Sequence, residues 1–581
     1  MVRAAKARLA RLRRPLAIPR AVVAVLRGGG ADRLVIAPPD IRTADPIAAD
    51  HIYAGHYSLA GKAVSTHGHS PFEIAPPSAA WSEALHGFGW LRHLRAADTA
   101  LARANARALV DDWITIEARG LSMDRRTMRD PRVVSRRLIS WLSQSPLILA
   151  GADHAFYRRF LGAVHSHCAA LRAALGEGLQ GEDRLTAAVA LVHAGLCLEA
   201  GGGMLRRASQ ALSQELSTQI LGDGGHQSRN PRVLVDLLLD LLPARQAFVA
   251  RGIVAPEAIL NAIDRMTPML RMFRHPDGSL AGFNGMGATE PDTLATLLAH
   301  GDVGAAAILE APYSCYQRLE AGGAVAIADV GAPPPWAYSG EAHAGCLSFE
   351  FSSGDDRLVI NCGAPRAQAG AVRDSARATA AHSTLILDDH SSSRFEPTGS
   401  RSIAAGLLLE GPRRVESLRR TEDDGATFLE AVHDGYARRY SVLHRRALRL
   451  AADGASLLGE DRLAPALAPR SRSRGIDLRS AGKAVLRFHL HPSVRAEAEG
   501  RSILLAPPSG ASWRFEAEGR AVALEESIFF AAAGGPRPTS QIVVEGGAGE
   551  AERFGWSFRR LRTAPGAAGR TSGDPPQVGE A

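Results

Sequence analysis

Residues 230–242 read Asn-Pro-Arg-Val-Leu-Val-Asp-Leu-Leu-Leu-Asp-Leu-Leu. An Asn side chain followed by Pro at the first helical position is a strong helix start, so a helix is predicted over Pro231–Arg251. Apart from Asp236 and Asp240, residues 233–242 are apolar nearly all round the helix. A helix of this kind packs on two sides. The segment therefore favours a double-layered ring of helical hairpins.

The sequence around this segment has the same helical pattern from about residue 90 to residue 300. Long Leu- and Ala-rich runs are separated by Gly, Pro or Asp, which mark helix ends. The predicted helices are Leu101–Ile116, Val133–Ala150, His154–Leu175, Leu185–Ala200, Met204–Leu221, Pro231–Arg251 and Pro256–Phe273. This part of the chain is predicted to be all-α.

After about residue 310 short runs rich in β formers replace the helices. Turn signals such as Ser352-Ser353-Gly354-Asp355 separate them, and the predicted strands include Cys346–Phe351, Arg357–Cys362, His382–Leu387 and Val485–His489. Strands at this spacing favour an antiparallel sandwich. The predicted fold is multidomain, α then β, with an incomplete (α/α) toroid followed by an antiparallel β-sandwich. Its predicted parts are a basic extension (1–50), the toroid (51–310), the sandwich (311–565) and a disordered tail (566–581).

Composition and charge exclude several classes of protein. The 581 residues are 46% hydrophobic and 22% charged, and no apolar run is long enough for a transmembrane helix. Residues 1–31 hold eight basic and no acidic side chains, which accounts for the whole net charge of +8. No aromatic platform accompanies them, so nucleic-acid binding is not predicted. The five cysteines are too scattered for a disulfide framework, and reduced thiols are predicted.

The N-terminal segment has two interpretations. It is a basic amphipathic extension that touches a membrane surface or an anionic polymer, or it is a frayed tail. The apolar run Ala21–Leu26 is short and follows Arg20 directly, which makes a poor export signal.

Five segments resemble the heparinase II/III family of polysaccharide lyases. Phe88–Leu94 (FGWLRHL) and Arg137–Trp141 (RLISW) look like toroid helices, and Asp223–Pro231 (DGGHQSRNP) is similar to a segment beside the family's cleft. His343–Glu350 (HAGCLSFE) and Arg377–Thr384 (RATAAHST) match sandwich strands, which His343 and His382 are predicted to begin. The resemblance implies β-elimination of a uronate-containing polysaccharide. In that reaction one group neutralises the sugar carboxylate while a base and an acid move protons.

The chain departs from the family pattern where these groups are expected. Arg232 and Val233 stand where family lyases carry a Tyr after the Pro of the toroid motif. Residues 182–187 (EDRLTA) stand where they carry an Asn, and no Tyr lies between Asn361 and His382. Other residues have then taken over these roles, the substrate differs, or the cleft only binds.

The residues predicted to be catalytic are His226, Arg229, His382 and Asn284. The two histidines would transfer protons, and Arg229 and Asn284 would position or neutralise the carboxylate. The predicted substrate-binding residues are Arg92, Asn230, Tyr316, Arg318 and Arg373. Structural alternatives stay open, since a His can order a Gly-rich turn, an Asn can cap a helix or form a turn, and a Tyr can pack in a core.

In relatives, the positions of His343, Asn361 and His382 can hold a structural metal, so a divalent zinc or calcium ion is one prediction for the sandwich. Asn361 stands where those relatives have an acid, and a neutral amide is a poor zinc ligand. The alternative is that His382 faces the cleft. No other cofactor is predicted.

Three functions remain in order of preference. The first is a lyase acting on an acidic polysaccharide, and the second is a non-catalytic glycan-binding or envelope-assembly protein on a lyase scaffold. The third is a toroid glycoside hydrolase using Asp236 and Asp240, although acids four apart on a helix are mostly solvent-facing. The family resemblance implies the cell envelope or periplasm, whereas the poor export signal predicts the cytoplasm.

Overall fold

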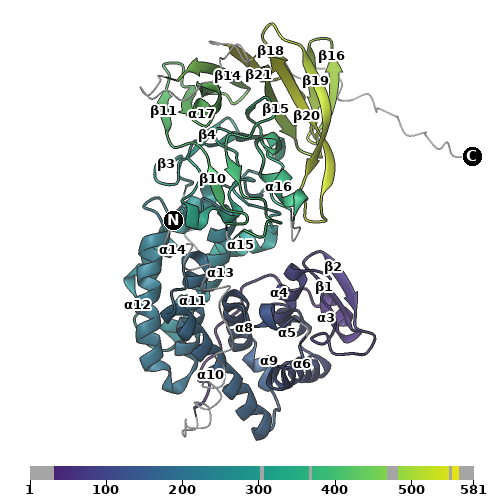
Figure 1. The fold of residues 1–581 in the computed structure, drawn as a ribbon, viewed down its shortest axis with the longest axis vertical. Helices are drawn as coiled ribbons and strands as arrows, with labels where there is room; N and C mark the ends of the chain where they lie inside the picture. The colour runs from purple at the N-terminus through teal and green to yellow at the C-terminus, as the bar shows by residue number, and fades with distance from the viewer. Residues whose placement is uncertain are drawn as a thin grey trace, which may run out of the picture.

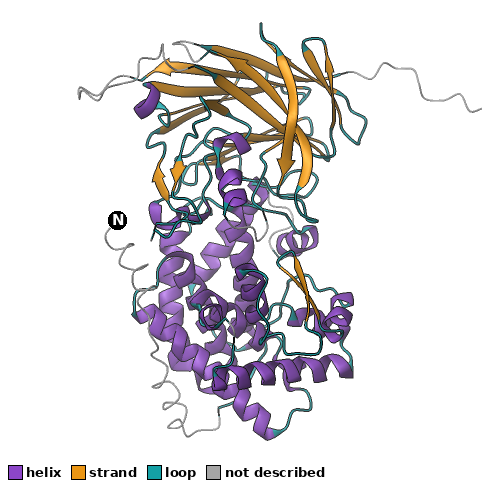
Figure 2. Ribbon diagram, turned by 45° about the vertical axis from the view of Figure 1, so that its right-hand side comes forward, coloured by secondary structure: helices purple, strands orange, loops and turns teal. Residues whose placement is uncertain are grey.

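The computed structural model describes residues 32–122, 124–300, 306–365, 370–402, 404–466, 482–547 and 552–561. Residues 1–31 of the predicted basic extension (1–50) and the whole predicted tail (566–581) therefore lie outside the described residues. Helices occupy one end of the molecule and two β-sheets the other, as Figures 1 and 2 show. This is the predicted order of an all-α region followed by an antiparallel sandwich.

The helical region is built from short and long helices. They are α3 (Ile47–Tyr53), α4 (Ala79–Gly87), α5 (Leu91–Ala97), α6 (Ala100–Arg119), α7 (Arg125–Met128), α8 (Pro131–Ser143), α9 (Ser145–Leu149), α10 (His154–Gly176), α11 (Gly181–Cys197), α12 (Gly202–Gln219), α13 (Pro231–Ala250), α14 (Glu257–Met272) and α15 (Pro291–Ala299), with one hairpin, β1 (His56–Leu59) and β2 (Lys62–Ser65). No helix among the described residues is long and apolar enough to cross a membrane.

Helix α13 forms as the sequence predicts. The Asn230 side-chain oxygen accepts a hydrogen bond from the Arg232 backbone N–H at 2.9 Å, and Pro231 occupies the first turn. The helix packs against α11 on one side and α14 on another. The single helix predicted over Val133–Ala150 is instead two, α8 and α9. Pro146 at the start of α9 lacks the N–H that a continuous helix would need.

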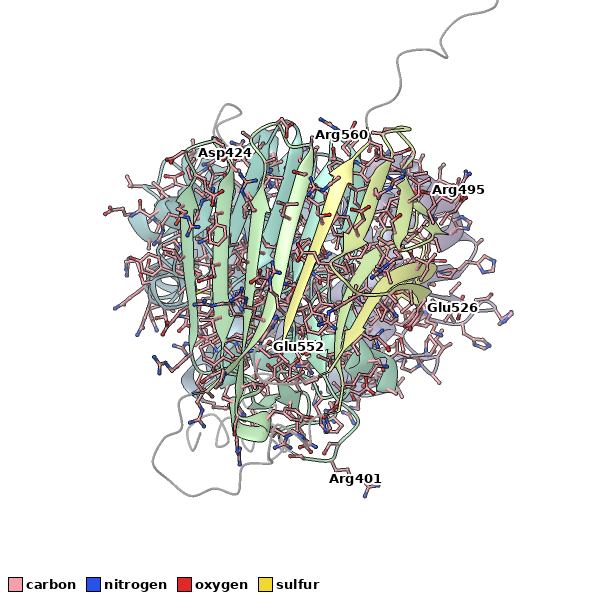
Figure 3. All side chains as sticks on the ribbon, turned by 90° about the horizontal axis from the view of Figure 1, so that it is seen from above. Arg401, Asp424, Arg495, Glu526, Glu552 and Arg560 are labelled. Carbon is pink, nitrogen blue, oxygen red and sulfur yellow. The ribbon has the colours of Figure 1, made fainter. Side chains whose placement is uncertain are left out.

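The second region is a sandwich of two antiparallel sheets. One sheet has the order β11 (Val415–Thr421), β12 (Thr427–His433), β13 (Val442–Leu450), β14 (Ser456–Pro465), β21 (Arg553–Arg560), β18 (Trp513–Ala517), β17 (Ser502–Ala506), β16 (Arg495–Glu499). The other has the order β19 (Val522–Phe529), β20 (Arg537–Gly546), β15 (Ala484–Leu490), β7 (Asp356–Ile360), β6 (Phe349–Ser353), β5 (Ala324–Asp329), β4 (Tyr316–Ala321), β3 (Glu310–Ala311), and β8 (Leu385–Leu387) pairs with β15. Seen from above, the first sheet covers the molecule, with Asp424 and Arg495 near its opposite edges (Figure 3).

Short elements occur along the chain between the longer strands of the sandwich. They are η2 (Trp336–Glu341), α16 (Ala371–Arg377), η3 (Thr379–Ala381), β9 (Arg394–Phe395), β10 (Leu408–Glu410) and α17 (Ala437–Tyr440). The sequence predicted that His343 and His382 each begin a strand, and this prediction is wrong. His343 lies in the loop after η2, and His382 closes the η3 turn through its backbone N–H to the Thr379 carbonyl oxygen at 3.0 Å.

The two regions share a continuous core at their junction. The hydrophobic core of the helices includes Tyr316, Val325 and Ile327 from β4 and β5, the first long strands of the sandwich. A second core lies between the two sheets. The cleft described below is therefore bordered by elements that are packed together.

Candidate functional site

A cleft of about 540 Å³ lies along the inner helices of the α region. Helices α8, α11 and α13 supply half of its lining residues, and Glu341 of η2 reaches it from the sandwich side. Two of the predicted substrate-binding residues, Arg92 and Asn230, line it. Its charged lining comprises five arginines and six carboxylates: Arg42, Arg92, Arg132, Arg136, Arg232, Glu83, Glu182, Asp236, Asp240, Glu290 and Glu341.

Most cleft arginines are already paired with acids of the same chain. Asp240 is 3% exposed and accepts hydrogen bonds from Arg42 at 2.7 Å and from Arg136 at 2.7 and 2.9 Å. Burial alone would raise the pKa of Asp240, but the Arg136 and Arg42 guanidiniums hold it well below its usual range. Asp240 is therefore a fixed anion, which removes it as the proton donor of the predicted hydrolase.

The remaining pairs in the cleft are more open. Arg232 lies 3.2 Å from Asp236, one turn along α13, and both side chains are about half exposed. Arg132 lies 3.4 Å from Asp183. Within the described parts of the chain Arg92 forms no ion pair, and its guanidinium donates to the carbonyl oxygens of Thr43 and Gly89.

Glu182 is a cleft residue whose chemistry the sequence does not reveal. It lies in the first turn of α11, where an acid is ordinarily a simple partner of the helix dipole. Burial raises the pKa of Glu182 to about 7; the Arg132 guanidinium lowers it, and the carboxylates of Asp183, Glu341 and Asp236 raise it further. The only sequence signal is its position, because residues 182–187 match the stretch where family lyases carry an Asn.

His226, a predicted proton-transfer residue, lies outside the cleft lining. It is 1% exposed, and Nε2 lies 3.0 Å from the Gln219 side-chain oxygen. Nδ1 accepts the Ser228 backbone N–H at 3.0 Å, and the ring meets Tyr338 edge to face. Burial lowers the pKa of His226 to about 3. The ring is therefore neutral and orders the Gly-rich turn, the structural alternative for this residue.

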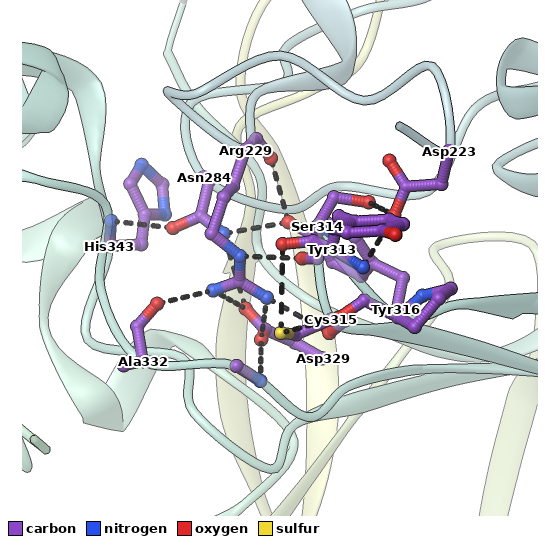
Figure 4. Close-up of polar contacts among 12 residues, drawn as sticks. Asp223, Arg229, Asn284, Tyr313, Ser314, Cys315, Tyr316, Asp329, Ala332 and His343 are labelled. Carbon is purple, nitrogen blue, oxygen red and sulfur yellow. Dashed lines mark hydrogen bonds and ion pairs between the residues drawn. The ribbon is translucent and has the colours of Figure 1, made fainter. Parts of the chain in front are cut away.

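Arg229, Asn284 and Tyr316 meet at the junction of the two regions, in a cluster with Asp329 (Figure 4). Arg229 has a backbone φ of 58° and reaches Asp329 at 2.5 Å, while Nε donates to the Ser314 carbonyl oxygen. The Tyr316 hydroxyl donates to the Arg229 carbonyl oxygen at 2.7 Å and accepts from Asn284 Nδ2 at 2.8 Å. Asn284 also contacts Asp329 at 3.1 Å. We call these four residues the junction cluster.

The junction cluster fixes the toroid segment that carries His226 onto the first strands of the sandwich. Its four side chains are at most 8% exposed, and the Arg229 guanidinium also lies 4.7 Å from the centre of the Tyr316 ring. Burial raises the pKa of Tyr316, so its hydroxyl keeps its proton. These groups have the residue types that β-elimination uses, yet their polar atoms bind one another.

Two further predicted substrate-binding residues lie outside the cleft lining. Arg318 donates to the carbonyl oxygens of Met272 and Arg274, at 3.1 and 2.8 Å, and so joins β4 to the end of α14. Arg373 of α16 hydrogen-bonds the Glu341 carboxylate and the Gly340 carbonyl oxygen. It therefore positions a cleft residue and does not line the cleft itself.

The side chains predicted to hold a metal form hydrogen bonds with one another and with the backbone. His382 Nδ1 donates to the Ala378 carbonyl oxygen at 2.7 Å, which leaves Nε2 to accept from His343 Nδ1 at 3.0 Å. The Asn361 side-chain oxygen accepts the Ser383 N–H at 3.0 Å. Two imidazoles and a neutral amide do not fit zinc or calcium. Among the described residues no group of three or more His, Cys, Asp and Glu is placed to hold a metal ion.

Comparison with known proteins identifies this arrangement. Residues 304–557 match the family model "Heparinase II/III-like, C-terminal". The FtsZ-localized protein C of Caulobacter vibrioides (strain NA1000 / CB15N) is 34% identical over 536 residues, which is 89% of this chain and 90% of that protein. The chain belongs to the heparinase II/III-like family.

Solved structures of this family share the complete architecture. A crystal structure of heparinase III superimposes with a TM-score of 0.67 at 14% identity, covering 93% of this chain and 89% of that one. A mutant of the heparan sulfate lyase HepC from Pedobacter heparinus gives 0.60 at 15% identity, covering 91% and 85%. The chain thus shares the toroid-plus-sandwich fold of these two solved structures.

Proposed function

We propose that this protein binds a glycan in the cleft of a lyase scaffold without cleaving it by β-elimination. The observation that supports this most is the location of the proton-handling side chains. Among the residues that the structure describes, no histidine or tyrosine lines the cleft. His226, His382 and Tyr316 are each at most 1% exposed and bonded to other protein groups. A base must come within hydrogen-bond reach of the proton that it removes.

The charge of the cleft supports a ligand different from a simple polyanion. Its six carboxylates outnumber its five arginines, and Asp240 and Asp236 already engage three of those arginines. A uniformly acidic polymer would meet at least as much repulsion as attraction here. We infer a glycan that carries anionic and cationic or amide groups along the same chain, as peptide-substituted wall glycans do.

The relative from Caulobacter supports a place of action. Its name describes it as FtsZ-localized, and its identity to this chain extends over most of both proteins. We extend that location to this chain as part of the proposal. A fluorescently tagged copy is expected to coincide with FtsZ in dividing cells. A uniform distribution would contradict this part of the proposal. It would not bear on glycan binding in the cleft.

A binding experiment with matched variants tests the proposal. The full-length protein is incubated with wall glycan, heparan sulfate and alginate, and both bound protein and polymer length are measured. We expect wall glycan to bind without being shortened, and Arg232→Ala to weaken binding roughly tenfold through loss of a charge-assisted contact. Arg245→Ala, on the same helix but outside the cleft lining, should bind as the wild type does. Absence of binding to all three polymers would overturn the proposal.

Glu182 favours a second candidate function, cleavage by acid–base catalysis in the cleft. A carboxyl group with a pKa of about 7 is suited to donate or accept a proton at neutral pH. Asp236 and Glu341 are the cleft carboxylates that raise its pKa and would supply the second acid. Shortening of any polymer by the wild type, abolished in Glu182→Gln, would establish this function in place of binding alone.

A further inference from the structure

A further cavity of about 360 Å³ lies where the loop between α14 and α15 meets the sandwich. This volume is sufficient for a small ligand. The sandwich contributes the start of β7, the turn after β15 and the connection between β19 and β20. Leu280 and Thr289 of the α14–α15 loop line both this cavity and the cleft, so the two cavities are neighbours. We call the smaller one the loop pocket.

Arg357 of β7 is built into the wall of the loop pocket with one nitrogen free. Its side chain is 6% exposed, and Nη2 donates to the Glu350 carboxylate at 2.6 Å. Glu350 is completely buried and does not line the pocket. Neither Nε nor Nη1 of Arg357 has a hydrogen-bond partner among the described residues, but only Nε is enclosed. Nη1 is therefore the part of the guanidinium that can donate to a ligand.

His491, in the turn after β15, offers a second donor from a different element. Burial and the Arg357 guanidinium lower the pKa of His491 to about 4, so the ring is neutral at pH 7. Nδ1 accepts the Ser493 backbone N–H at 3.3 Å, which places the proton of the neutral ring on Nε2. Nε2 has no hydrogen-bond partner in the described part of the chain and is not enclosed. It is therefore free to donate.

The two donors lie beside an apolar wall. The centre of the Phe529 ring is 5.5 Å from that of His491 and 5.8 Å from the Arg357 guanidinium. Leu280 and residues 531–534 (AAAG) also line the pocket. A ligand here meets hydrogen-bond donors and small apolar side chains together, which is the usual composition of a specific small-molecule site.

The charged lining of the loop pocket favours an anion. Arg357 and Arg537 line it against one carboxylate, that of Asp277. Oδ1 of Asp277 already accepts the Ser279 backbone N–H at 2.8 Å and the Ser279 hydroxyl at 2.6 Å. A guanidinium nitrogen and an imidazole N–H without partners are donors that a carboxylate accepts from.

We propose that the loop pocket binds a carboxylate that lies next to a small apolar group, as at the end of a short peptide substituent of a glycan. Arg357 Nη1 and His491 Nε2 donate to the carboxylate, and Phe529 and Leu280 contact the apolar group. For the source of the carboxylate the inference rests on the proposed glycan binding, because the neighbouring cleft would hold the sugar chain. The pocket itself can be tested with a free peptide.

Titration calorimetry on the full-length protein tests the pocket with three probes. They are N-acetyl-alanyl-alanine, the same dipeptide with an amide in place of its carboxylate, and inorganic phosphate. We expect saturable binding of the acid dipeptide, none of the amide, and phosphate binding at least roughly tenfold weaker because phosphate lacks the apolar group. Absence of acid-dipeptide binding, or equal binding of the amide, would overturn the proposal. Tighter binding of phosphate would overturn the assignment to a carboxylate.

Two variants each remove one donor and keep the shape of the wall. His491→Phe keeps a ring but lacks Nε2–H, and it should weaken dipeptide binding several-fold. Arg357→Lys keeps a cation beside Glu350 but lacks the second nitrogen, and it should weaken binding roughly tenfold. Unchanged binding in both variants would overturn the proposal.

The matched control is Arg495→Ala, at an exposed arginine two residues beyond Ser493 that does not line the pocket. It should bind the dipeptide as the wild type does. Weakening in Arg495→Ala equal to that in Arg357→Lys would also overturn the proposal, because the dipeptide would then respond only to overall charge.

The inference and the proposed function fail separately. A wild-type protein that binds wall glycan but not the acid dipeptide would overturn only the loop pocket. Binding of the dipeptide without binding of any glycan would overturn only the proposed function of the cleft.

Discussion

Two arginine–aspartate pairs have arginines only three residues apart in the chain, yet the pairs differ in burial and in the groups that surround them. Arg229 and Asp329 join the two regions of the protein, and their side chains are 7% and 3% exposed. Arg232 and Asp236 lie on one helix face in the cleft, with side chains 41% and 49% exposed. The first pair is surrounded by protein acceptors, whereas the second can meet a ligand. The same residue types therefore hold the fold together in one place and remain available for binding in the other.

The largest expected effect is loss of the buried partner. Asp329→Ala leaves the Arg229 guanidinium uncompensated in the junction, which should reduce the free energy of unfolding by about 3–5 kcal/mol. Asp236→Ala removes an exposed pair on a helix and should cost less than about 0.5 kcal/mol. Urea unfolding of both variants measures the difference. Equal costs would show that the two pairs do not differ as described.

Acid should lower the stability of the fold through its buried histidines. Burial lowers the pKa of His226 to about 3 and that of His382 to about 4, whereas an unfolded histidine titrates near 6.5. The unfolded chain therefore takes up protons first, so stability falls as the pH drops below about 6.5. Each such histidine should cost roughly 2 kcal/mol by pH 5, and nothing above pH 7.

Unfolding in urea at pH 7 and pH 5 checks this sign. His226→Gln should lose less stability between the two pH values than the wild type, because one buried imidazole is gone. His51→Gln, at an exposed position, should behave as the wild type does. The interpretation fails if His226→Gln shows the full pH dependence of the wild type.

A smaller effect is expected from the tyrosine of the junction cluster. Tyr316→Phe removes a hydroxyl that donates to the Arg229 carbonyl and accepts from Asn284, which should cost about 1–3 kcal/mol. Tyr313→Phe, at a side chain that is 67% exposed, is the matched control and should leave stability unchanged. Thermal unfolding of the two variants compares them directly, and a Tyr316→Phe protein as stable as its control would contradict the assigned role.

The smallest stability effect is expected in the cleft. Arg232→Ala should change the free energy of unfolding by less than about 0.5 kcal/mol, because its ion pair is exposed and screened. Its consequence should appear in glycan binding instead. If Arg232→Ala lost stability but kept glycan binding, the cleft pair would serve the fold and not the ligand, which would contradict the comparison.

The fold was largely predictable because its signals are local. Asn230-Pro231 caps and starts α13, and the all-round apolar run 233–242 requires partners on both sides, which α11 and α14 provide. The short runs of β-forming residues after residue 310 predict the sandwich for the same reason, since alternation and turns are encoded within a few residues.

The site was less predictable because its properties come from distant partners. Nothing near Arg229 indicates that Asp329, a hundred residues later in the chain, takes up its charge. The raised pKa of Glu182 likewise comes from its burial in the fold, with smaller contributions from distant carboxylates such as Glu341 and Asp236. His226 resembled a reactive loop histidine, and only the fold places Gln219 and Tyr338 around its ring.

The most direct test of this account is whether the protein forms unsaturated uronates. The wild type is incubated with heparan sulfate, alginate and bacterial capsule, and ultraviolet absorbance of the unsaturated product is followed, with a heparinase III preparation as a positive control. The account predicts a flat trace on every polymer, because His226, His382 and Tyr316 are buried and hydrogen-bonded outside the cleft lining. A sustained rise that scales with protein concentration would contradict it and assign β-elimination to the cleft.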